Sequence, residues 1–233
     1  MLTQTLEFTK KYFVIGLISF SFFCNQNLNA SNEPIIRVLI SKEKNLRIRA
    51  DSNIPLIFKY KNIIKKNVKG ITLKKEINST KLIFDNNKSK VYEIEVDQGL
   101  LIKSYDERGI WVGGKRYSGL IKIKNLKNQI FVINILGIEK YLTSVVGSEM
   151  PHQWPLEALK AQAIASRTYA LKKTGNNLYD IDSTQIDQVY NGLESMTYKT
   201  NKAVKQTRSL IITYNDKLIN ALFHSSSAGM TEN

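Results

Sequence analysis

The spacing of the apolar residues changes near residue 137, and this change restricts the fold more than any other feature. Before it, short runs rich in β-branched residues are separated by Asn, Asp, Ser and Gly, which is typical of strands. After it, the apolar residues follow the spacing of one helix face, at Ile138, Tyr141, Leu142, Val145 and Val146. Polar residues such as Thr143 and Ser144 are expected on the exposed face of this helix. The sequence therefore predicts an α+β protein, with a β-rich N-terminal part, a helical core and then a β-hairpin.

The β-rich part contains six candidate strands and a predicted hairpin. The candidate strands are residues 35–40, 46–50, 54–60, 68–73, 81–84 and 91–96. Residues 120–124 and 129–135 predict a hairpin that turns through residues 125–128. We expect these strands to form a twisted sheet or a partial barrel.

Two consecutive helices are predicted on either side of Glu149. Gly147 is the expected stop of the first helix, with a positive φ angle. Pro155 suits the first position of the second helix, and Gly175 ends it. Apolar residues lie on nearly every side of this second helix, so we expect it to be largely buried. A short helix at residues 201–208 and a hairpin around Asn215-Asp216 follow.

The N-terminus has the layout of a secretory signal peptide. Lys10 and Lys11 precede an apolar run at residues 12–23, and Ala30 offers a cleavage site. The run is shorter than the roughly 20 residues that a membrane-spanning helix needs. We expect residues 1–30 to be removed, the protein to be exported to the periplasm or cell wall, and any membrane contact to occur only through an uncleaved signal segment. The one cysteine, Cys24, lies inside this segment.

The composition narrows the possible partners. The formal net charge is +14, which outside the cell favours contact with anionic wall polymers or an anionic membrane surface. The basic residues are scattered, however, and do not form the clustered stripe of a nucleic-acid-binding protein, so no nucleic-acid partner is expected. Two histidines and no cysteine beyond residue 30 make a zinc site improbable. We expect no metal and no cofactor.

Glu149 is the candidate catalytic residue. It lies in the predicted break between the two helices, and Met150 and Trp154 could provide an apolar wall beside it. The end of the first helix disfavours an ionised carboxylate, whereas the start of the second favours one. A glutamic acid that keeps its proton near neutral pH can protonate the leaving oxygen of a sugar bond. The alternative is that Glu149 caps the second helix or pairs with a cation.

Other polar residues allow competing interpretations. Arg167 and Gln162 lie on the second helix, where they either form a buried structural pair or line the same cleft as Glu149. His224 precedes a serine run, but the sequence lacks the Gly-x-Ser-x-Gly elbow of a serine hydrolase. Asp180, Asp182 and Asp187 occur close together, without the spacing of a calcium-binding EF-hand loop. One of these three remains a candidate second carboxylate.

An ordered set of short motifs identifies a resemblance that covers residues 110–233 closely and the N-terminal half loosely. The motifs are Tyr117-Ser118-Gly119, Val132-Ile133-Asn134, residues 138–142, Glu149-Met150-Pro151, residues 154–163, residues 165–170, residues 188–192, Ala203-Val204 with Thr207, and residues 225–231. Together they resemble the stage II sporulation protein D family, whose relatives include the amidase-enhancer protein of the bacterial cell wall.

The resemblance implies a function and a set of site residues. It makes Glu149 the single general acid and base of a peptidoglycan lytic transglycosylase, with the substrate's own hydroxyl as nucleophile. It implies that substrate is bound by Arg167, Gln162, Gln188, Tyr190, Ser225 and Ser226. The implied partners are peptidoglycan glycan strands and a cell-wall amidase. The runner-up function is a non-catalytic glycan-binding module that stimulates such an amidase. A third is a basic scaffold protein in which Glu149 and its surroundings have no catalytic role.

The chain departs from the family pattern in three places. Ala228 replaces the first of two glycines near the serine motif, and the cysteines that bind zinc together with His near this region in some members are missing here. The family domain also normally continues beyond this motif. We therefore expect residues 31–109 to form a β-rich region and residues 110–233 to form a catalytic-type domain that is incomplete at its C-terminus.

Overall fold

The computed structural model of the protein describes residues 33–51, 53–76, 79–85, 87–94, 99–126, 128–175 and 177–224. Contacts within the chain separate Met1–Glu33 from Pro34–Asn233, and all the elements described below belong to the second unit. The predicted signal peptide, residues 1–30, lies outside the described residues, as do Ser225 and Ser226. Within the described part, no helix has both the length and the apolar character needed to cross a membrane.

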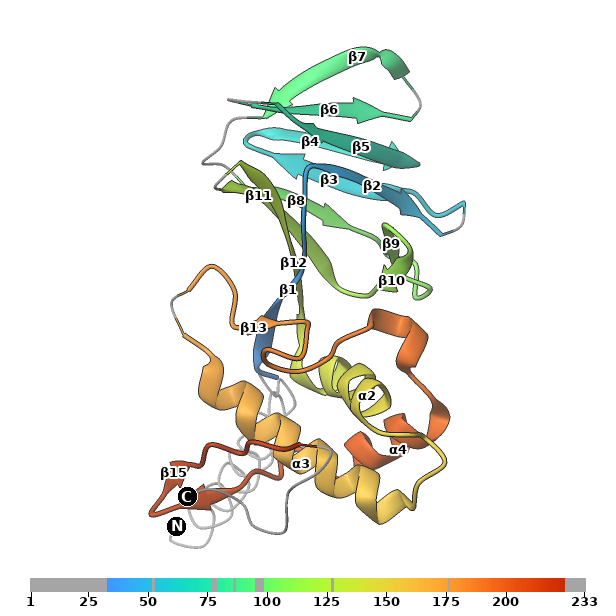
Figure 1. Cartoon of the computed structure of the whole chain (residues 1–233). Helices are drawn as coiled ribbons and strands as arrows, with labels where there is room; N and C mark the ends of the chain where they lie inside the picture. Colours follow the sequence, from blue (N-terminus) through green and yellow to red (C-terminus); the bar gives the residue numbers. More distant parts are fainter. Residues whose placement is uncertain are drawn as a thin grey trace, which may run out of the picture. The chain divides into compact units, whose positions relative to one another are not determined.

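The first of two large sheets contains seven strands within the described residues, in the order β13-β1-β12-β11-β8-β3-β4 (Figure 1). Its strands are β1 (Ile35–Glu43), β3 (Leu56–Tyr60), β4 (Ile63–Val68), β8 (Leu100–Lys103), β11 (Leu120–Leu126), β12 (Gln129–Gly137) and β13 (Ile181–Asp182). Neighbouring strands are antiparallel, except that β13 runs parallel to β1. Only β13 comes from the part of the chain that follows the first helices.

The second sheet contains six described strands in the order β10-β9-β2-β5-β6-β7. Its strands are β2 (Asn45–Ala50), β5 (Gly70–Lys75), β6 (Thr80–Phe84), β7 (Asn87–Ile94), β9 (Ile110–Val112) and β10 (Lys115–Tyr117). In β2, Leu46 and Ile48 are buried while Asn45 and Arg47 are exposed, as expected of a sheet with one covered face. Buried side chains of both sheets and of the helices join one hydrophobic core.

The strand predictions are partly confirmed. The predicted hairpin around residues 125–128 is present as β11 and β12, with Leu126 opposite Gln129. The run at 68–73 is not one strand, because Val68 ends β4 and Gly70 begins β5. Strands β4, β8, β9, β10 and β13 were not predicted from the sequence. Ile63 and Ile64 of β4 are both exposed, so this strand has no alternating pattern to detect.

Strand β12 connects the sheets directly to the helices. It pairs with β1 over almost its whole length, and its residues 130–134 are all buried. Helix α2 (Ile138–Glu149) begins at the next residue, and Ile138 N–H donates to Pro34 O at 2.9 Å. Because no loop intervenes, the position of α2 is set by the sheet.

Helix α2 confirms the predicted apolar face but corrects two details. Ile138, Tyr141 and Val145 are buried as expected, but Thr143 and Ser144, which were expected to be exposed, are buried too. Gly147 does not stop the helix, and its φ is not among the positive values. A Cβ atom at position 147 would lie 1.9 Å from Ser195 O, so glycine is required by close packing against the segment at residue 195.

The remaining helices pack against α2 (Figure 1). They are α3 (Leu156–Lys173), the 3₁₀ turn η1 (Gly192–Ser195) and α4 (Tyr198–Gln206). Helix α3 is less buried than expected: residues 166–170 are buried, but Glu157 and Ala161 are exposed. Thr197 and Thr200 form a capping box that starts α4.

The last described elements are β14 (Thr213–Tyr214) and β15 (Lys217–Leu218). Asn215 and Asp216 connect them with φ angles of 47° and 58°, which confirms the predicted turn. The α+β class and the order of sheets, helices and hairpin are therefore as predicted. Strands from both sides of residue 110 share the two large sheets, and the predicted division into domains at that residue stays a prediction.

Candidate functional site

Glu149 is the last residue of α2, directly before Met150 and Pro151. Its side chain is half-buried, and its Oε1 accepts a hydrogen bond from Val189 N–H at 2.6 Å. Within the described part of the chain, no Lys, Arg or His forms an ion pair with Glu149. One backbone N–H therefore orients this carboxylate, while Oε2 has no hydrogen bond to any described residue.

The segment that meets Glu149 is anchored by the side chains on either side of Val189. Gln188 is fully buried, accepts a hydrogen bond from Tyr141 OH at 2.8 Å and donates to Ser166 O at 3.3 Å. Tyr190 is also buried and donates to Asn134 Oδ1 at 2.7 Å. These bonds on both sides of Val189 hold the backbone in place, and its N–H binds Glu149.

Three buried tyrosines pack against one another at this segment. The ring of Tyr190 lies 5.2 Å from that of Tyr141 and 5.7 Å from that of Tyr117, measured between centroids. Burial raises the pKa of all three hydroxyls, and raises that of Tyr117 to about 12. For Tyr141, the nearby negative charge of Glu149 contributes in the same direction. The hydroxyls therefore stay protonated and keep donating near neutral pH.

Polar contacts continue from Glu149 to the surface. Asn191 Nδ2 donates to Ser148 Oγ at 3.1 Å, and Asn191 Oδ1 accepts from Lys115 Nζ at 2.8 Å. Lys115 lies on β10 and is exposed. A chain of side-chain contacts thus leads from the residue before Glu149 to a surface ammonium group.

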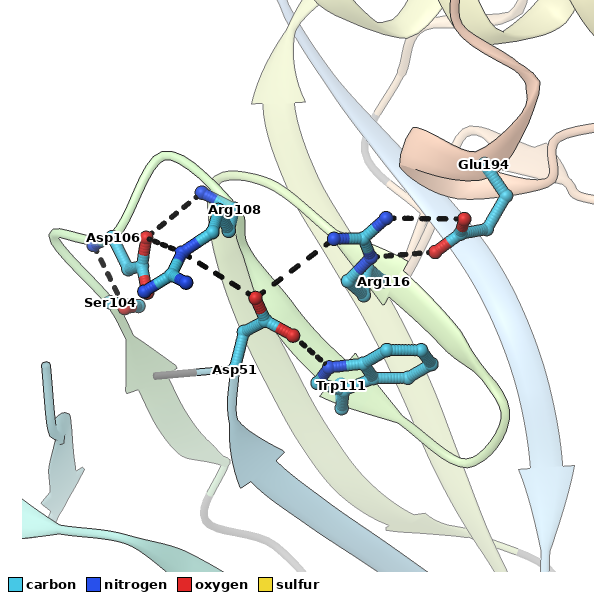
Figure 2. A network of polar contacts seen from close by, with 7 residues as sticks. All are labelled: Asp51, Ser104, Asp106, Arg108, Trp111, Arg116 and Glu194. Carbon is cyan, nitrogen blue, oxygen red and sulfur yellow. Dashed lines mark hydrogen bonds and ion pairs between the residues drawn. The ribbon is translucent and has the colours of Figure 1, made fainter. Parts of the chain in front are cut away.

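A second network fixes η1 to the sheets (Figure 2). Arg116 donates to both carboxylate oxygens of Glu194, at 2.7 and 3.3 Å, and these bonds lower the pKa of Glu194. Asp51 lies 3.9 Å from Arg116 and 3.5 Å from Arg108, and accepts a hydrogen bond from the indole N–H of Trp111. This network holds η1, which follows the Glu149-binding segment and packs on α2.

Comparison with known proteins assigns one segment of the chain to a family. Residues 126–214 match the family model described as "SpoIID: Stage II sporulation protein". This segment is a SpoIID family domain. It contains α2, α3, η1 and α4, and therefore both Glu149 and Val189.

Three curated relatives of the chain are informative. An amidase enhancer of Bacillus subtilis is 39% identical over 166 residues, which is 70% of this chain and 22% of that protein. Stage II sporulation protein D of Bacillus subtilis is 38% identical over 114 residues, or 41% of this chain and 33% of that protein. An uncharacterised protein of Brachyspira hyodysenteriae is 37% identical over 161 residues, or 66% of this chain and 43% of that protein. The chain thus spans less than half the length of these relatives.

The SpoIID segment brings three of the predicted site residues together, because Glu149, Gln188 and Tyr190 lie around the segment at Val189. Arg167 instead forms a two-bond ion pair with Glu139, at 2.9 and 2.7 Å, and is 1% exposed. Gln162 donates to Ser166 Oγ at 3.1 Å. Their predicted roles in substrate binding stay predictions, as do those of Ser225 and Ser226, which lie outside the described residues.

The three aspartates of the following loop have separate partners. Asp180 pairs with Arg37, and Asp187 pairs with Lys173 at 2.9 Å. Asp182 accepts bonds from the backbone and side chain of Thr184. Among the described residues, no group of three or more His, Cys, Asp or Glu side chains is placed to hold a metal ion. Each of the three aspartates therefore has partners of its own among the described residues, and a role for one of them as second carboxylate stays a prediction.

Sequence reasoning missed several residues that build the site. Asn134 was noted only as part of a motif, yet it is fully buried, and its amide donates to Ser118 O and Leu120 O while its oxygen accepts from Tyr190. A single amide in the middle of an apolar strand was the available signal. Tyr141 was counted only as part of an apolar helix face. Asn191 was part of the motif at residues 188–192, whereas Ser148 and Lys115 carried no signal, since the contacts among the three depend on the fold.

Proposed function

We propose that this protein is exported to the cell wall and cleaves the glycan strands of peptidoglycan as a lytic transglycosylase. Glu149 acts as the general acid and then as the general base. The family match and the relatives named for sporulation and for amidase enhancement support a role connected with the cell wall. The finer assignment to glycan cleavage rests on the surroundings of Glu149.

The observation that carries the proposal is the contrast between Glu149 and the neighbouring acids. Residues 138–208 contain seven carboxylates, and within the described structure five of them form ion pairs: Glu139, Glu157, Asp180, Asp187 and Glu194. Asp182 is bonded to Thr184. Glu149 has only the N–H of Val189, on one oxygen. Glu149 and Asp182 are thus the two acids of this segment that are oriented without being neutralised by a described cation, and Glu149 is the one that the family resemblance makes the catalytic acid.

The proposed reaction needs one carboxylate. The proton on Glu149 passes to the oxygen that links two sugars, and the bond between that oxygen and the anomeric carbon breaks. The six-position hydroxyl of the same sugar then attacks the anomeric carbon, and its proton returns to Glu149. No water is consumed, so the product is a 1,6-anhydro sugar. Val189 N–H holds Oε1, which leaves Oε2 for the proton transfer.

A second function is favoured by one specific finding. The relative that covers the largest share of this chain among those described above, 70%, is named an amidase enhancer. In this alternative, the protein binds glycan without cleaving it and stimulates a separate cell-wall amidase. The two functions differ in whether they require the carboxylate of Glu149.

Replacement of Glu149 by glutamine separates the two functions. We expect Glu149→Gln to fold normally and to lower the rate of glycan cleavage at least about a hundredfold, since it removes a general acid. Mass spectrometry of digested glycan should show an anhydro product one water lighter than the hydrolysis product. Glu157→Gln is the matched control, because Glu157 is an exposed glutamate in the same segment. Undiminished cleavage by Glu149→Gln refutes the enzymatic proposal, and amidase stimulation that survives the change supports the second function.

A further inference from the structure

One face of the seven-stranded sheet carries a group of lysines. In β3, β8 and β11, every second residue is buried. Four lysines alternate with these buried residues, so they lie on the outer face of the sheet. They are Lys59 of β3, Lys103 of β8, and Lys122 and Lys124 of β11, and we call them the lysine track. Lys59 and Lys103 are exposed and the other two are half-buried, so the sheet presents four cations on one side.

The pairing of the strands places the four lysines one after another across the sheet. Leu101 of β8 lies opposite Lys122 on one side and opposite Lys59 on the other. Lys103 is two positions further along β8, and Lys124 is two positions from Lys122 along β11. From the usual spacing of residues and strands, the Cα atoms of neighbouring members of the lysine track are roughly 7–8 Å apart. The cations therefore follow a line rather than gathering at one point.

The charge of the lysine track is not neutralised within the described structure. Strands β3, β8, β11 and β12 contain no Asp or Glu at all. None of the four ammonium groups has a hydrogen bond or an ion pair with a described residue. Lys103 Nζ lies 4.8 Å from the ring centroid of Tyr105, a cation–π contact that leaves the positive charge in place. An ammonium group has three N–H donors, so the track can bind an anion at each of its members.

The line of cations has an acid at its end toward β1. Phe131 of β12 lies opposite Lys124 and opposite Lys42 of β1, whose Nζ is 5.5 Å from the centroid of the Phe131 ring. Lys42 lines a pocket together with Asp182, so a carboxylate is present at this end. Lys42 is therefore not counted in the lysine track, and an anionic ligand would extend from Lys124 toward Lys59.

Between the lysines, the outer face of the sheet is apolar and only half-buried. Ile57 of β3, Leu101 of β8 and Leu120 of β11 occupy the outward positions there. Cations that alternate with aliphatic side chains match a chain molecule in which anions alternate with short carbon linkers. A membrane-surface site would instead need apolar side chains that enter the lipid. At the sheet edge, Ile64 lies opposite Lys59 and is 58% exposed, so lipid vesicles are included in the test below.

We propose that the lysine track binds a linear anionic polymer of the cell envelope whose units are joined by phosphodiesters. Each ammonium group binds one phosphate, and the short linkers between phosphates lie over the half-buried apolar residues. A short carbon linker separates successive phosphates by a distance comparable to that between neighbouring lysines. The inference goes beyond the proposed function, because it does not involve Glu149 and shares with that function only the location outside the cytoplasm. Such binding would retain the exported protein at the envelope.

The test compares a fourfold variant of the lysine track with a matched fourfold control. The track variant combines Lys59→Gln, Lys103→Gln, Lys122→Gln and Lys124→Gln. The control replaces four exposed lysines of α2, α4 and the last hairpin by glutamine, namely Lys140, Lys202, Lys205 and Lys217. Both variants lower the net charge by the same amount, so a difference in binding between them cannot come from net charge.

Binding is measured by titration calorimetry on the full chain. The probes are poly(glycerol phosphate), the neutral polymer dextran, and vesicles that contain phosphatidylglycerol. The unmodified protein should bind the phosphate polymer, and its affinity should fall roughly fiftyfold to a hundredfold between about 50 and 200 mM salt, because about four ionic contacts release counterions. The track variant should bind this polymer about thirtyfold more weakly at low salt, and the control less than about threefold more weakly. Dextran should bind to neither.

The outcomes that overturn the inference are distinct. Equal losses in the track variant and the control mean that net charge alone attracts the polymer. Absence of binding to the phosphate polymer, or equal binding of dextran, refutes the site. A loss of vesicle binding in the track variant that equals or exceeds its loss of polymer binding identifies a membrane-facing surface instead. The single changes Lys59→Gln and Lys103→Gln, each expected to weaken polymer binding about twofold to threefold, decide the matter if the fourfold variant does not fold. None of these results bears on glycan cleavage by Glu149, which its own variant tests.

Discussion

Arg167 binds both carboxylate oxygens of Glu139 across the contact between α3 and α2, at 2.9 and 2.7 Å. The same guanidinium donates to Leu210 O at 3.1 Å, in the chain segment that follows α4. One buried cation therefore ties together two helices and the start of the C-terminal segment. These structural contacts are sufficient to explain why an arginine lies on the buried part of α3.

The ion pair between Arg167 and Glu139 predicts that loss of Arg167 strongly destabilises the folded protein. Arg167→Met removes the cation from a buried site and should lower the free energy of unfolding by about 3 kcal/mol or more. Glu139→Gln added to this variant should recover part of the loss, because the charge left behind is removed. Chemical denaturation measures both changes, with the exposed Arg208 replaced by Met as control. A loss no larger than the control's would mean that the pair acts like a surface ion pair.

The close contact at Gly147 predicts that no larger residue fits between α2 and η1 without moving the backbone. A methyl group at this position would lie 1.9 Å from Ser195 O, so the backbone has to move. Gly147→Ala should lower the free energy of unfolding by about 1–3 kcal/mol, although alanine is the better helix former. Thermal unfolding should show the loss. Gly175→Ala, where a Cβ meets nothing within 4 Å, should be close to neutral, and equal effects at the two sites would contradict the proposed packing.

The lowered pKa of Asp187 predicts that the stability of the protein depends on pH in the acid range. Burial acts to raise its pKa, but hydrogen bonds from Asp182 N–H, Tyr169 and Lys173 outweigh burial and hold the pKa below its ordinary value of 3.8. A lowered folded-state pKa stabilises the protein above the unfolded value, and this contribution is lost as the pH falls below about 4. Asp187→Asn should therefore reduce stability at neutral pH and weaken its decline in acid.

Unfolding followed from pH 7 to pH 2 measures the effect at Asp187. The control is Glu157→Gln, since Glu157 pairs with Lys160 on the exposed side of α3. Parallel curves for the unmodified protein and Asp187→Asn across the acid range would show that Asp187 does not contribute to this dependence.

The buried tyrosines predict a decline in stability on the alkaline side. Burial raises the pKa of Tyr117 to about 12, while an unfolded tyrosine ionises near pH 10. A raised folded-state pKa gives stability that is complete below the unfolded value and is lost as the pH rises through the folded one. Tyr117→Phe keeps the ring against Tyr190 and should reduce this alkaline loss.

Tyrosinate absorbance and unfolding measured from pH 8 to pH 12 test the role of Tyr117. Tyr198 is 85% exposed on α4, so Tyr198→Phe is the control and should leave the alkaline loss of stability unchanged. Ionisation of every tyrosine near pH 10 in the folded protein would contradict the prediction.

Part of the fold could be predicted because it follows from patterns among residues that are close together in the sequence. The face of α2 followed from apolar residues three and four positions apart, such as Ile138 and Tyr141, and the last hairpin from Asn215-Asp216. Strands β9 and β10, by contrast, have three residues each, too few for an alternating pattern, and β9 pairs with β2, which lies far away in the sequence. The Gly113-Gly114 turn between them is a local hairpin signal that the sequence predictions did not use.

The residues of the site, too, were predicted only in part. Glu149 stood out because an acid between two helix signals is a local feature. Thr143 and Ser144 look like exposed helix positions, and only the packing of η1 on α2 buries them. The bond from Val189 to Glu149 joins residues forty positions apart, so no spacing in the sequence could indicate it.

The order of apolar and polar residues by itself determined the secondary structure and the candidate acid, since both depend on neighbours within a few positions along the chain. Only the tertiary structure decided which carboxylates are neutralised by cations, which glycine is required by close packing, and which backbone N–H orients Glu149. These properties depend on distances between residues far apart in the sequence, and folding alone brings such residues together.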